Sequence, residues 1–593
     1  MRRRWIAFRA VKHPLLRWTS IAGGVLFGLA LAWVAITALL ARQDVKNLDN
    51  RVEQVTLLVA SGHVDAARSL ARSIPALADR AHSLTTGPAW WVGAHIPFLG
   101  RPLEVGRGTA LSASRVGRTA VPELVGVAGA LNPEALRASG DTIRLAPLVR
   151  VLPELQQATR AIDDAYDQVT ALPQHTWLSP VDHGRASYAA QLDVVRGYVD
   201  AASRVARVLP SMLGQHRRQT YFIGLQNEAE LRGTGGLPGA FAIATAYHGT
   251  IHFTRFESDI ALEPPVKNHA IRTGLHFGAG YTAAYGDSLP TQSFLNSNIS
   301  PNFPYAAQIW AAMWQRTSGQ HVDGAIALDP TALAFFLNAV GPAHLPNGGT
   351  LDAASVITFT ERDQYALIPD FGARKALDVS ILHAAADKIV SGAGNALSIL
   401  RAASESATQQ RLQVWSSDPS VESVLRQTNF AGTIPVTKAA FAGPVLNNEA
   451  GGKLDFYLTR SMTYASTGCG TRDVLVTLTF TNNAPASGLP AYVTHRYDDP
   501  PPGAVPGDNH DLLDYYATAG AQLESVTVDG KLATATTERD LGHPIFRVDL
   551  QLPRGATQTV VLHLTEPGSD GVPQIWQQPG VAPMTVQTYA QKC

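Results

Sequence analysis

The chain has 593 residues, with 48 lysine and arginine residues, 48 aspartate and glutamate residues and a formal net charge of zero. Nucleic-acid binding is not expected, because no basic patch stands out beyond the N-terminus to neutralise phosphates. Hydrophobic residues make up 45% of the chain and charged residues 16%, a balance that excludes an intrinsically disordered protein. The length indicates about three or four domains.

The first predicted elements are a basic tail over residues 1–17 and a transmembrane helix over residues 18–41. Residues 18–41 carry no charged side chain, and about 20 apolar residues suffice for a helix to cross a bilayer. A cleavable signal peptide has a shorter apolar region and a small-residue cleavage site, which Ala38-Leu39-Leu40-Ala41 matches poorly. Because basic flanks stay in the cytoplasm, we expect a single-pass cell-membrane protein with a cytoplasmic N-terminus and residues 42–593 outside.

Residues 42–218 are predicted to form a helical stalk. Apolar side chains recur every three or four residues along its first helix, which is the pattern of an amphipathic helix; they are Val45, Leu48, Val52, Val55 and Leu58. Ser61-Gly62-His63 interrupts this pattern, and helical periodicity is present again over residues 148–172.

Residues 219–450 are predicted to form an α/β domain and residues 451–593 a β-sandwich. Strand patterns over 221–225, 240–246 and 324–328 alternate with helical patterns over 305–317 and 330–340, which is typical of a central sheet covered by helices. Asp329-Pro330 predicts a helix N-cap followed by proline at the first helical position. After residue 451, short strand patterns are separated by turns such as Asp529-Gly530, as in a sandwich.

The two cysteines, Cys469 and Cys593, predict one disulfide. In an exported chain a small, even number of cysteines indicates a structural bond. Such a bond would tie down a C-terminus that otherwise frays. The alternative is two free thiols, or a contact of Cys593 with a partner.

The most informative motif runs from Leu225 to Gly236, where polar and glycine residues stand between two apolar runs. Loops at the ends of buried strands carry the chemistry of α/β folds, and glycine lets the backbone approach a ligand. The forked guanidinium of Arg232 suits a phosphate or a carboxylate. We therefore expect Glu228, Glu230 and Arg232 to bind a ligand; the alternative is a structural turn with a surface ion pair.

Carboxylates and arginines at other predicted element ends extend this candidate site. They are Asp259, Arg362, Asp370 and Arg374. If they converge, the arginines would offset phosphate charge, Asp259 and Asp370 would act as catalytic bases, and Asp259 would bind a divalent cation. The alternatives are a solvated helix end with ion pairs over 361–375 and a helix cap at Asp370.

The run over residues 226–236 resembles the signature of an uncharacterised actinobacterial envelope family, the domain of unknown function four-thousand-and-twelve. The resemblance extends over roughly residues 50–460. It includes Asn302-Phe303-Pro304, Val322-Asp323-Gly324, Asp329-Pro330 and Glu361-Arg362-Asp363-Gln364-Tyr365.

More remotely, the 219–400 core resembles the LytR-CpsA-Psr phosphotransferases. Leu231-Arg232-Gly233-Thr234 is similar to their Arg-x-Asp-Thr motif, with Gly233 in place of the Asp, and Ser258-Asp259 stands where they have Pro-Arg-Asp. Their last motif matches Arg362, Asp370 and Arg374. The resemblance implies an α/β fold of that kind, Mg²⁺ as cofactor, and the membrane, a polyprenyl-phosphate lipid and a cell-wall glycopolymer as partners.

Two functions are compatible with the sequence. The first is a membrane-anchored transferase that moves a glycopolymer from a polyprenyl-pyrophosphate carrier to the cell wall. The second is a non-catalytic envelope protein that binds a polyprenyl lipid or scaffolds other envelope proteins. A sensor with a cytoplasmic output is disfavoured, because only a short basic tail is expected on that side.

Overall fold

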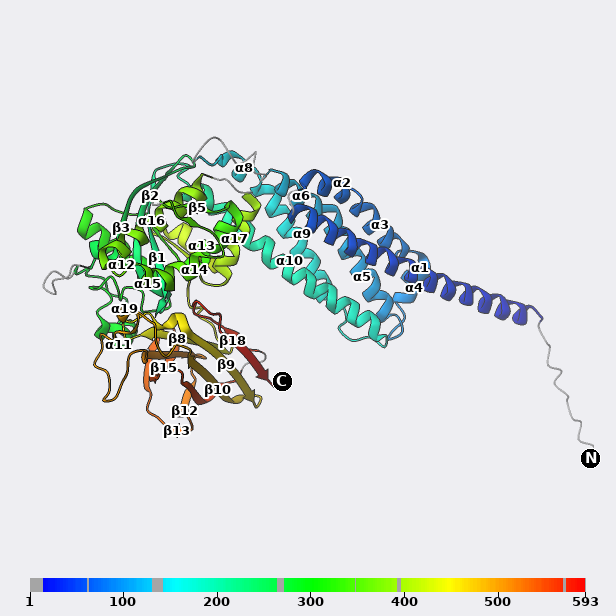
Figure 1. Cartoon of the computed structure of the whole chain (residues 1–593). Coiled ribbons are helices and arrows are strands. Elements are labelled where there is room, and N and C mark those ends of the chain that lie inside the picture. The colour runs from blue at the N-terminus through cyan, green and yellow to red at the C-terminus, as the bar shows by residue number, and fades with distance from the viewer. Residues whose placement is uncertain are drawn as a thin grey trace, which may run out of the picture. The chain divides into compact units, whose positions relative to one another are not determined.

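The structure is a computed structural model that describes residues 14–60, 63–130, 142–263, 271–346, 348–391, 396–568 and 572–591. Its contacts divide the chain into two compact units (Figure 1). Unit 1 comprises residues 1–132 and 149–203, and unit 2 comprises residues 133–148 and 204–593.

Unit 1 is a bundle of helices. Fully buried alanines such as Ala78, Ala158 and Ala165 line its interior, and their small side chains let neighbouring helices approach closely. The elements are α1 (Pro14–Ala60), α2 (Val64–Ala71), α3 (Ile74–Leu84), α4 (Pro88–Ala94), α5 (Arg101–Arg115), the π-helical η1 (Val116–Ala120), α6 (Val121–Ala130), α9 (Leu152–Thr170) and α10 (Ser179–Met212), of which the last turns belong to unit 2. The short α8 (Leu145–Arg150) precedes α9.

Helix α1 corrects the prediction of a membrane anchor. It continues without interruption beyond Ala41, and Thr37, Ala41 and Leu48 are buried. The indole Nε1 of Trp90 in α4 donates a hydrogen bond to the Thr37 hydroxyl at 2.7 Å, so the end of the charge-free run packs within its own bundle. Across the described ranges, no helix combines the length and the apolar character needed to cross a bilayer. The predicted transmembrane helix over 18–41 and the single-pass membrane localisation are therefore wrong.

Unit 2 contains a five-stranded sheet in the order β3-β2-β1-β4-β7. Its strands are β1 (Gln219–Arg232), β2 (Gly235–Tyr247), β3 (Thr250–Ser258), β4 (Gly324–Leu328) and β7 (Leu412–Ser416). β1 pairs antiparallel with β2 and parallel with β4, and β4 pairs antiparallel with β7. Successive side chains of β1 point to opposite faces, so Phe222 packs in the core under α12, whereas Ile223 and Leu225 face α13 and α16.

Helices and short segments between β3 and Phe441 surround this sheet. They are η2 (Asp259–Ala261), α11 (Ala279–Tyr285), η4 (Gly286–Ser288), α12 (Phe303–Ser318), α13 (Pro330–Val340), α14 (Val356–Thr358), the π-helical η5 (Phe359–Asp363), α15 (Gln364–Leu367), α16 (Phe371–Val390), α17 (Ala396–Thr408), α18 (Pro419–Leu425) and η6 (Asn429–Ala431), with a small hairpin of β5 (Ala343–His344) and β6 (Thr350–Leu351). The exception is α11, whose Tyr281 and Tyr285 pack in a core with Phe441 and Tyr516 of the later sheets. The predicted N-cap at the start of α13 is confirmed: Asp329 accepts a hydrogen bond from the Ala332 amide at 2.7 Å, with Pro330 at the first helical position.

From Phe441 onward the chain forms two further sheets that enclose one hydrophobic core. The six-stranded sheet has the order β13-β12-β16-β10-β9-β18 and the five-stranded sheet the order β14-β15-β11-β8-β17. The strands are β8 (Phe441–Asn448), β9 (Leu458–Thr467), β10 (Thr471–Asn482), β11 (Asn509–Ala517), β12 (Gln522–Val528), β13 (Lys531–Leu532), β14 (Thr536–Asp540), β15 (His543–Leu552), β16 (Thr557–Pro567), β17 (Gln574–Ile575) and β18 (Thr585–Ala590), with the short helices η7 (Leu454–Tyr457) and α19 (Ala491–Thr494).

The predicted fold class is therefore wrong in its order and kinds of domain. The structure consists of helices and mixed sheets, without the transmembrane helix that the prediction placed first. Antiparallel β2 and β7 flank the parallel β1–β4 pair. β2 follows β1 through a tight turn, whereas residues 329–411 connect β4 to β7. β8, which the prediction assigned to the α/β region, pairs with β11 in a different sheet.

The C-terminal strand bears on the predicted disulfide. β18 pairs parallel with β9, and Ala590 lies opposite Ser466. Each of these two residues stands three positions before a cysteine, Cys593 and Cys469 respectively. Cys593 lies outside the described residues, so the bond stays a prediction.

Replacing Cys469 by serine is expected to lower the free energy of unfolding by roughly 2–5 kcal/mol, because a bond to Cys593 closes a long loop of the unfolded chain. Urea denaturation of the full chain measures the loss. Cys593→Ser should give the same loss, and the double variant no further loss. Reaction of both thiols with an alkylating reagent in the folded protein would show that the cysteines are not paired.

Candidate functional site

The predicted ligand-binding loop is the end of one strand and the turn into the next. β1 continues to Arg232 and β2 begins at Gly235. A Cβ atom on Gly233 would lie 2.2 Å from the Ile299 carbonyl oxygen, and one on Gly236 would lie 2.2 Å from that of Asn227. The glycines thus allow the close approach of the protein's own backbone segments.

Arg232 is buried, and its guanidinium donates to groups of the protein itself. Nη1 donates to the carbonyl oxygens of Leu231 at 2.9 Å and Asn448 at 3.0 Å, Nη2 to Glu230 Oε1 at 2.9 Å, and Nε to the Leu295 carbonyl oxygen at 3.3 Å. This arrangement corresponds to the structural alternative for the motif, with a buried rather than a surface ion pair.

Glu230 extends this ion pair to a second cation. Its other oxygen, Oε2, accepts a hydrogen bond from the buried ammonium of Lys453. Burial raises the pKa of Glu230, while the charges of Lys453 and Arg232 lower it, and the net shift is downward. Glu230 therefore stays ionised, and its charge is compensated within the protein.

Glu228 belongs to a second buried cluster, centred on Arg411 at the edge of β7. Arg411 Nη1 lies 2.6 Å from Glu228 Oε1 and 3.1 Å from Asp329 Oδ2. Its Nη2 donates to the Gly580 carbonyl oxygen at 2.8 Å. Glu361 Oε1 accepts the Glu228 amide at 2.8 Å. Burial, followed by the negative charge of Glu228, raises the pKa of both Asp329 and Glu361, so the cluster retains protons that exposed carboxyls would release.

Asp259 is paired with a lysine. Lys375 Nζ lies 2.8 Å from the Asp259 carboxylate, and both side chains are largely buried. Burial raises the pKa of Asp259, and the charge of Lys375 lowers it. Nearby, Gln364 donates to Asp378 Oδ1 at 3.0 Å. Burial raises the pKa of Asp378 to about 6, against the lowering effect of Lys375.

The last three predicted residues have local structural partners. Arg362 is half-exposed and its Nε lies 2.7 Å from Asp363. Arg374 Nη1 donates to the Ile368 carbonyl oxygen at 2.7 Å, and its guanidinium lies 4.1 Å from the centre of the Tyr492 ring. Asp370 caps α16, as the alternative reading expected, by accepting the Ala373 amide at 2.7 Å.

The predicted residues are distributed over several ion pairs. The charge of Lys453, the partner of Glu230, also lowers the pKa of Asp259, and Lys453 and Arg362 line one small pocket. Glu230 with Arg232, Glu228 with Arg411, and Asp259 with Lys375 each form an ion pair. Among the described residues, no contact joins Arg232, Arg362 and Arg374 to one another, and no cluster of three or more His, Cys, Asp and Glu side chains could hold a metal ion. The Mg²⁺ site at Asp259 stays a prediction.

Sequence reasoning did not single out Arg411, Lys453 and Asp378. A signal existed for Arg411, because an arginine that opens an apolar strand pattern has to find a counter-charge when the strand is buried. The partners lie 183 residues away in Glu228 and 82 residues away in Asp329, so no local pattern identifies them.

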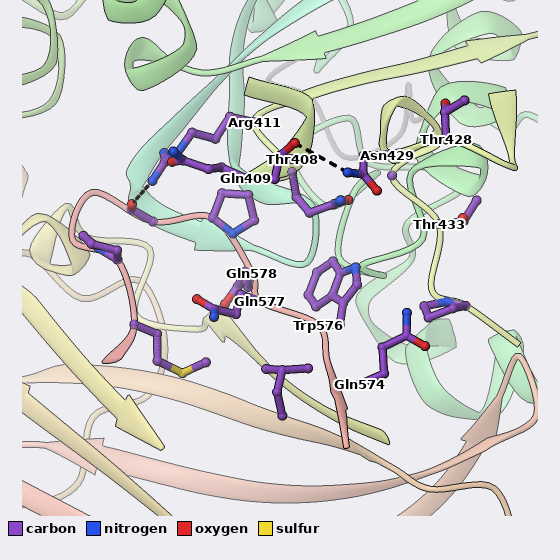
Figure 2. Close-up of a pocket in the computed structure, with 18 of the residues that line it drawn as sticks. Thr408, Gln409, Arg411, Thr428, Asn429, Thr433, Gln574, Trp576, Gln577 and Gln578 are labelled. Atoms are coloured by element: carbon purple, nitrogen blue, oxygen red, sulfur yellow. Dashed lines mark hydrogen bonds between the residues drawn. The ribbon is translucent and has the colours of Figure 1, made fainter. Parts of the chain in front are cut away.

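Two pockets of unit 2 have contrasting linings. The first, of about 290 Å³, is lined by apolar residues of one sheet face and by the last turns of α10. The second, of about 660 Å³, is lined by amide, hydroxyl and aromatic side chains between the α17–β7 turn, η6 and residues 574–584 (Figure 2).

Comparisons with known proteins assign part of unit 2. Residues 216–365 match the family described as "Protein of unknown function (DUF4012)". The DUF4012 region runs from β1 to α15 and contains Glu228, Arg232, Asp329 and Glu361, whereas Arg411 lies beyond it. The match is shorter than the resemblance expected over residues 50–460. No curated protein and no solved structure matches the chain, so the resemblance to LytR-CpsA-Psr enzymes and the actinobacterial origin stay predictions.

Replacing Arg411 by methionine is expected to lower the free energy of unfolding by about 3–5 kcal/mol at neutral pH, because the buried Glu228 loses its cation and Asp329 loses a hydrogen-bond donor. Urea denaturation measures the loss. Arg196→Met is the control: Arg196 pairs with Asp163 at 3.0 Å, and the two side chains are 41% and 44% exposed, so the loss should not exceed about 1 kcal/mol. Equal losses in the two variants would contradict a special role of the Arg411 cluster.

Replacing Asp378 by asparagine should change how stability depends on pH. The pKa of Asp378 is raised from 3.8 to about 6 in the folded protein. Its contribution to stability is thus fully present below about pH 4 and is lost as the pH rises through about 6. At 1.36 kcal/mol per pKa unit this loss is about 3 kcal/mol. Urea denaturation at several pH values should show that wild type loses this stability relative to D378N between pH 4 and pH 7. Parallel curves would contradict the prediction.

Proposed function

We propose that the chain is a non-catalytic binding protein that holds the hydrocarbon chain of a polyprenyl lipid in the apolar pocket of unit 2. The observation that carries this proposal is the lining: 17 of the 18 residues around the pocket are hydrophobic, and Thr245 is the exception. Enclosing a hydrocarbon there is favourable, since it removes apolar surface of both lipid and protein from water.

The pocket lies where the central sheet is not fully covered by helices. Ile223 of β1, Phe253 of β3 and Ile326 of β4 contribute its floor, and Leu209 and Met212 of α10 contribute its other wall. Tyr221 also lines it, with its hydroxyl already donated to the Met212 carbonyl oxygen at 2.6 Å. The tyrosine therefore presents its ring to the cavity without an unsatisfied polar group. The volume of about 290 Å³ is small for a ligand site and fits a segment of a long chain.

The cations at the beginning of β1 offer a place for the lipid phosphate. Arg218 is exposed and lies three residues before Tyr221, which lines the pocket. This separation corresponds to about 10 Å of extended chain, and the Arg218 guanidinium lies over the Tyr247 ring, 5.3 Å from its centre, at the end of β2. Arg232, which the sequence suggested for this role, donates its hydrogen bonds within the protein, so Arg218 is the better candidate.

We prefer the non-catalytic function to glycopolymer transfer because the protein itself engages both predicted catalytic carboxylates. Asp370 caps a helix and Asp259 is held by Lys375. A general base has to reach the proton that it removes, and these carboxylates are engaged by the protein in other ways.

Filling the pocket tests the proposal. Ala244 lies in the pocket wall and is buried, so Ala244→Phe should occupy the space of the lipid chain and weaken binding of undecaprenyl phosphate at least about tenfold, which corresponds to 1.4 kcal/mol. Native mass spectrometry of the detergent-solubilised full chain measures binding. Ala246→Phe is a second variant of the same design.

Ala354→Phe is the matched control, because Ala354 is exposed and does not line the pocket. Arg218→Ala should weaken binding of the phosphate but not of undecaprenol. If wild type does not bind the lipid, or if the folded Ala244→Phe and Ala246→Phe proteins bind it as tightly as wild type does, the proposal is wrong.

A further inference from the structure

We infer that the second pocket, which we call the amide pocket, binds a neutral oligosaccharide. It lies between the start of β7, the turn around η6 and the segment 574–584, all within unit 2 (Figure 2). Its volume of about 660 Å³ falls within the range of small-molecule sites. The inference does not depend on lipid binding, because the amide pocket shares no lining residue with the apolar pocket.

Neutral hydrogen-bonding side chains dominate the rim of the amide pocket. Five exposed amides line it: Gln409, Gln427, Asn429, Gln574 and Gln577. Hydroxyl groups of threonines stand among them, as Figure 2 shows. Amides and hydroxyls both donate and accept hydrogen bonds, and this is the capability needed to bind the hydroxyl groups of a sugar.

The charges at the pocket are compensated within the protein. Its two arginines, Arg411 and Arg426, pair with carboxylates at 2.6 Å and 2.9 Å, and no carboxylate is among the lining residues. An ionic ligand would therefore give up its hydration without gaining an unpaired counter-charge, whereas a neutral ligand avoids this cost.

Trp576 provides a buried donor without an acceptor. The residue is only 5% exposed, and its indole Nε1 has no hydrogen-bond partner. Figure 2 shows the indole nitrogen directed into the pocket, on the side of Asn429. Leaving such a donor unpaired costs about 1–3 kcal/mol, and a ligand hydroxyl that displaces the neighbouring flexible amides would recover this energy.

A second side chain of the pocket also has a polar atom that a ligand could satisfy. Gln410 Oε1 is buried and also has no hydrogen-bond partner, and Gln410 lines the pocket. The pocket thus has both an unpaired donor and an unpaired acceptor among its lining residues. A sugar hydroxyl satisfies both types, because it donates one hydrogen bond and accepts others.

The segment that carries Trp576 is held in place by hydrogen bonds on both sides. The Trp576 amide donates to the Ala442 carbonyl oxygen at 2.9 Å. The Gln578 side chain donates to the Arg232 carbonyl oxygen at 2.8 Å, and Arg411 donates to Gly580. A site that is ordered before binding loses less conformational entropy on binding, so weak individual contacts with a sugar suffice.

The test uses the full chain with maltotriose, cellotetraose and N,N′,N″-triacetylchitotriose as neutral probes, and trigalacturonic acid as a charged probe. Saturation-transfer NMR and the change in tryptophan fluorescence detect binding. Wild type should bind at least one neutral probe and bind trigalacturonic acid more weakly. Trp576→Phe keeps an aromatic ring but lacks the N–H group, and Asn429→Ala removes an exposed amide; each should weaken binding roughly five- to tenfold.

Two controls separate this inference from the lipid proposal. Gln157→Ala removes an exposed amide of α9 outside the pocket and should leave saccharide binding unchanged. Ala244→Phe should also leave it unchanged, and Trp576→Phe should leave undecaprenyl phosphate binding unchanged. The inference is overturned if no neutral probe binds, if the charged probe binds more tightly, or if the folded Trp576→Phe and Asn429→Ala proteins bind like wild type.

Discussion

Arg411 holds together parts of unit 2 that are far apart in the sequence. Its guanidinium contacts Glu228 in β1, Asp329 at the start of α13 and the Gly580 carbonyl oxygen in the C-terminal segment. Buried carboxylates require such a partner, because an uncompensated charge in the interior costs several kcal/mol. One side chain thus links the end of β1, the cap of α13 and the segment 574–584. The contacts of Arg411 therefore help to set the geometry of both the edge of the central sheet and the amide pocket.

A second buried network joins the central sheet to the C-terminal sheets. Glu230 is shared by Arg232 and Lys453, and Asp455 Oδ2 accepts both the Leu231 amide at 2.7 Å and the Asn448 side chain at 2.9 Å. In a low-dielectric interior each hydrogen bond is stronger, and an unmade bond is more costly. The polar residues at the end of β1 therefore act as a specific joint between two sheets. This role explains their density without requiring a ligand at that place.

The sequence predicted features that depend on neighbouring residues. Asp329-Pro330 marked the start of α13, and Asp370 was recognised as a possible cap of α16, because a cap bonds to amides two or three residues away. The candidate site was not predictable in this way, since the groups that engage Arg232 and Glu230 lie more than 200 residues away in Asn448 and Lys453. The prediction of a membrane helix was wrong for a related reason: a hydropathy pattern does not reveal that Thr37 accepts a hydrogen bond from Trp90 within a helical bundle.

Two counter-charges of the buried acids, Arg411 and Lys453, lie outside the DUF4012 region. Glu228 and Asp329 fall within residues 216–365, but their cation is Arg411; Glu230 shares its charge with Lys453. A fragment that ends at residue 365 would bury these acids without Arg411 and Lys453. It would also lack β7, the edge strand of the central sheet. The matched region is thus not a self-contained folding unit in this chain, because its buried acids depend on cations that lie beyond residue 365.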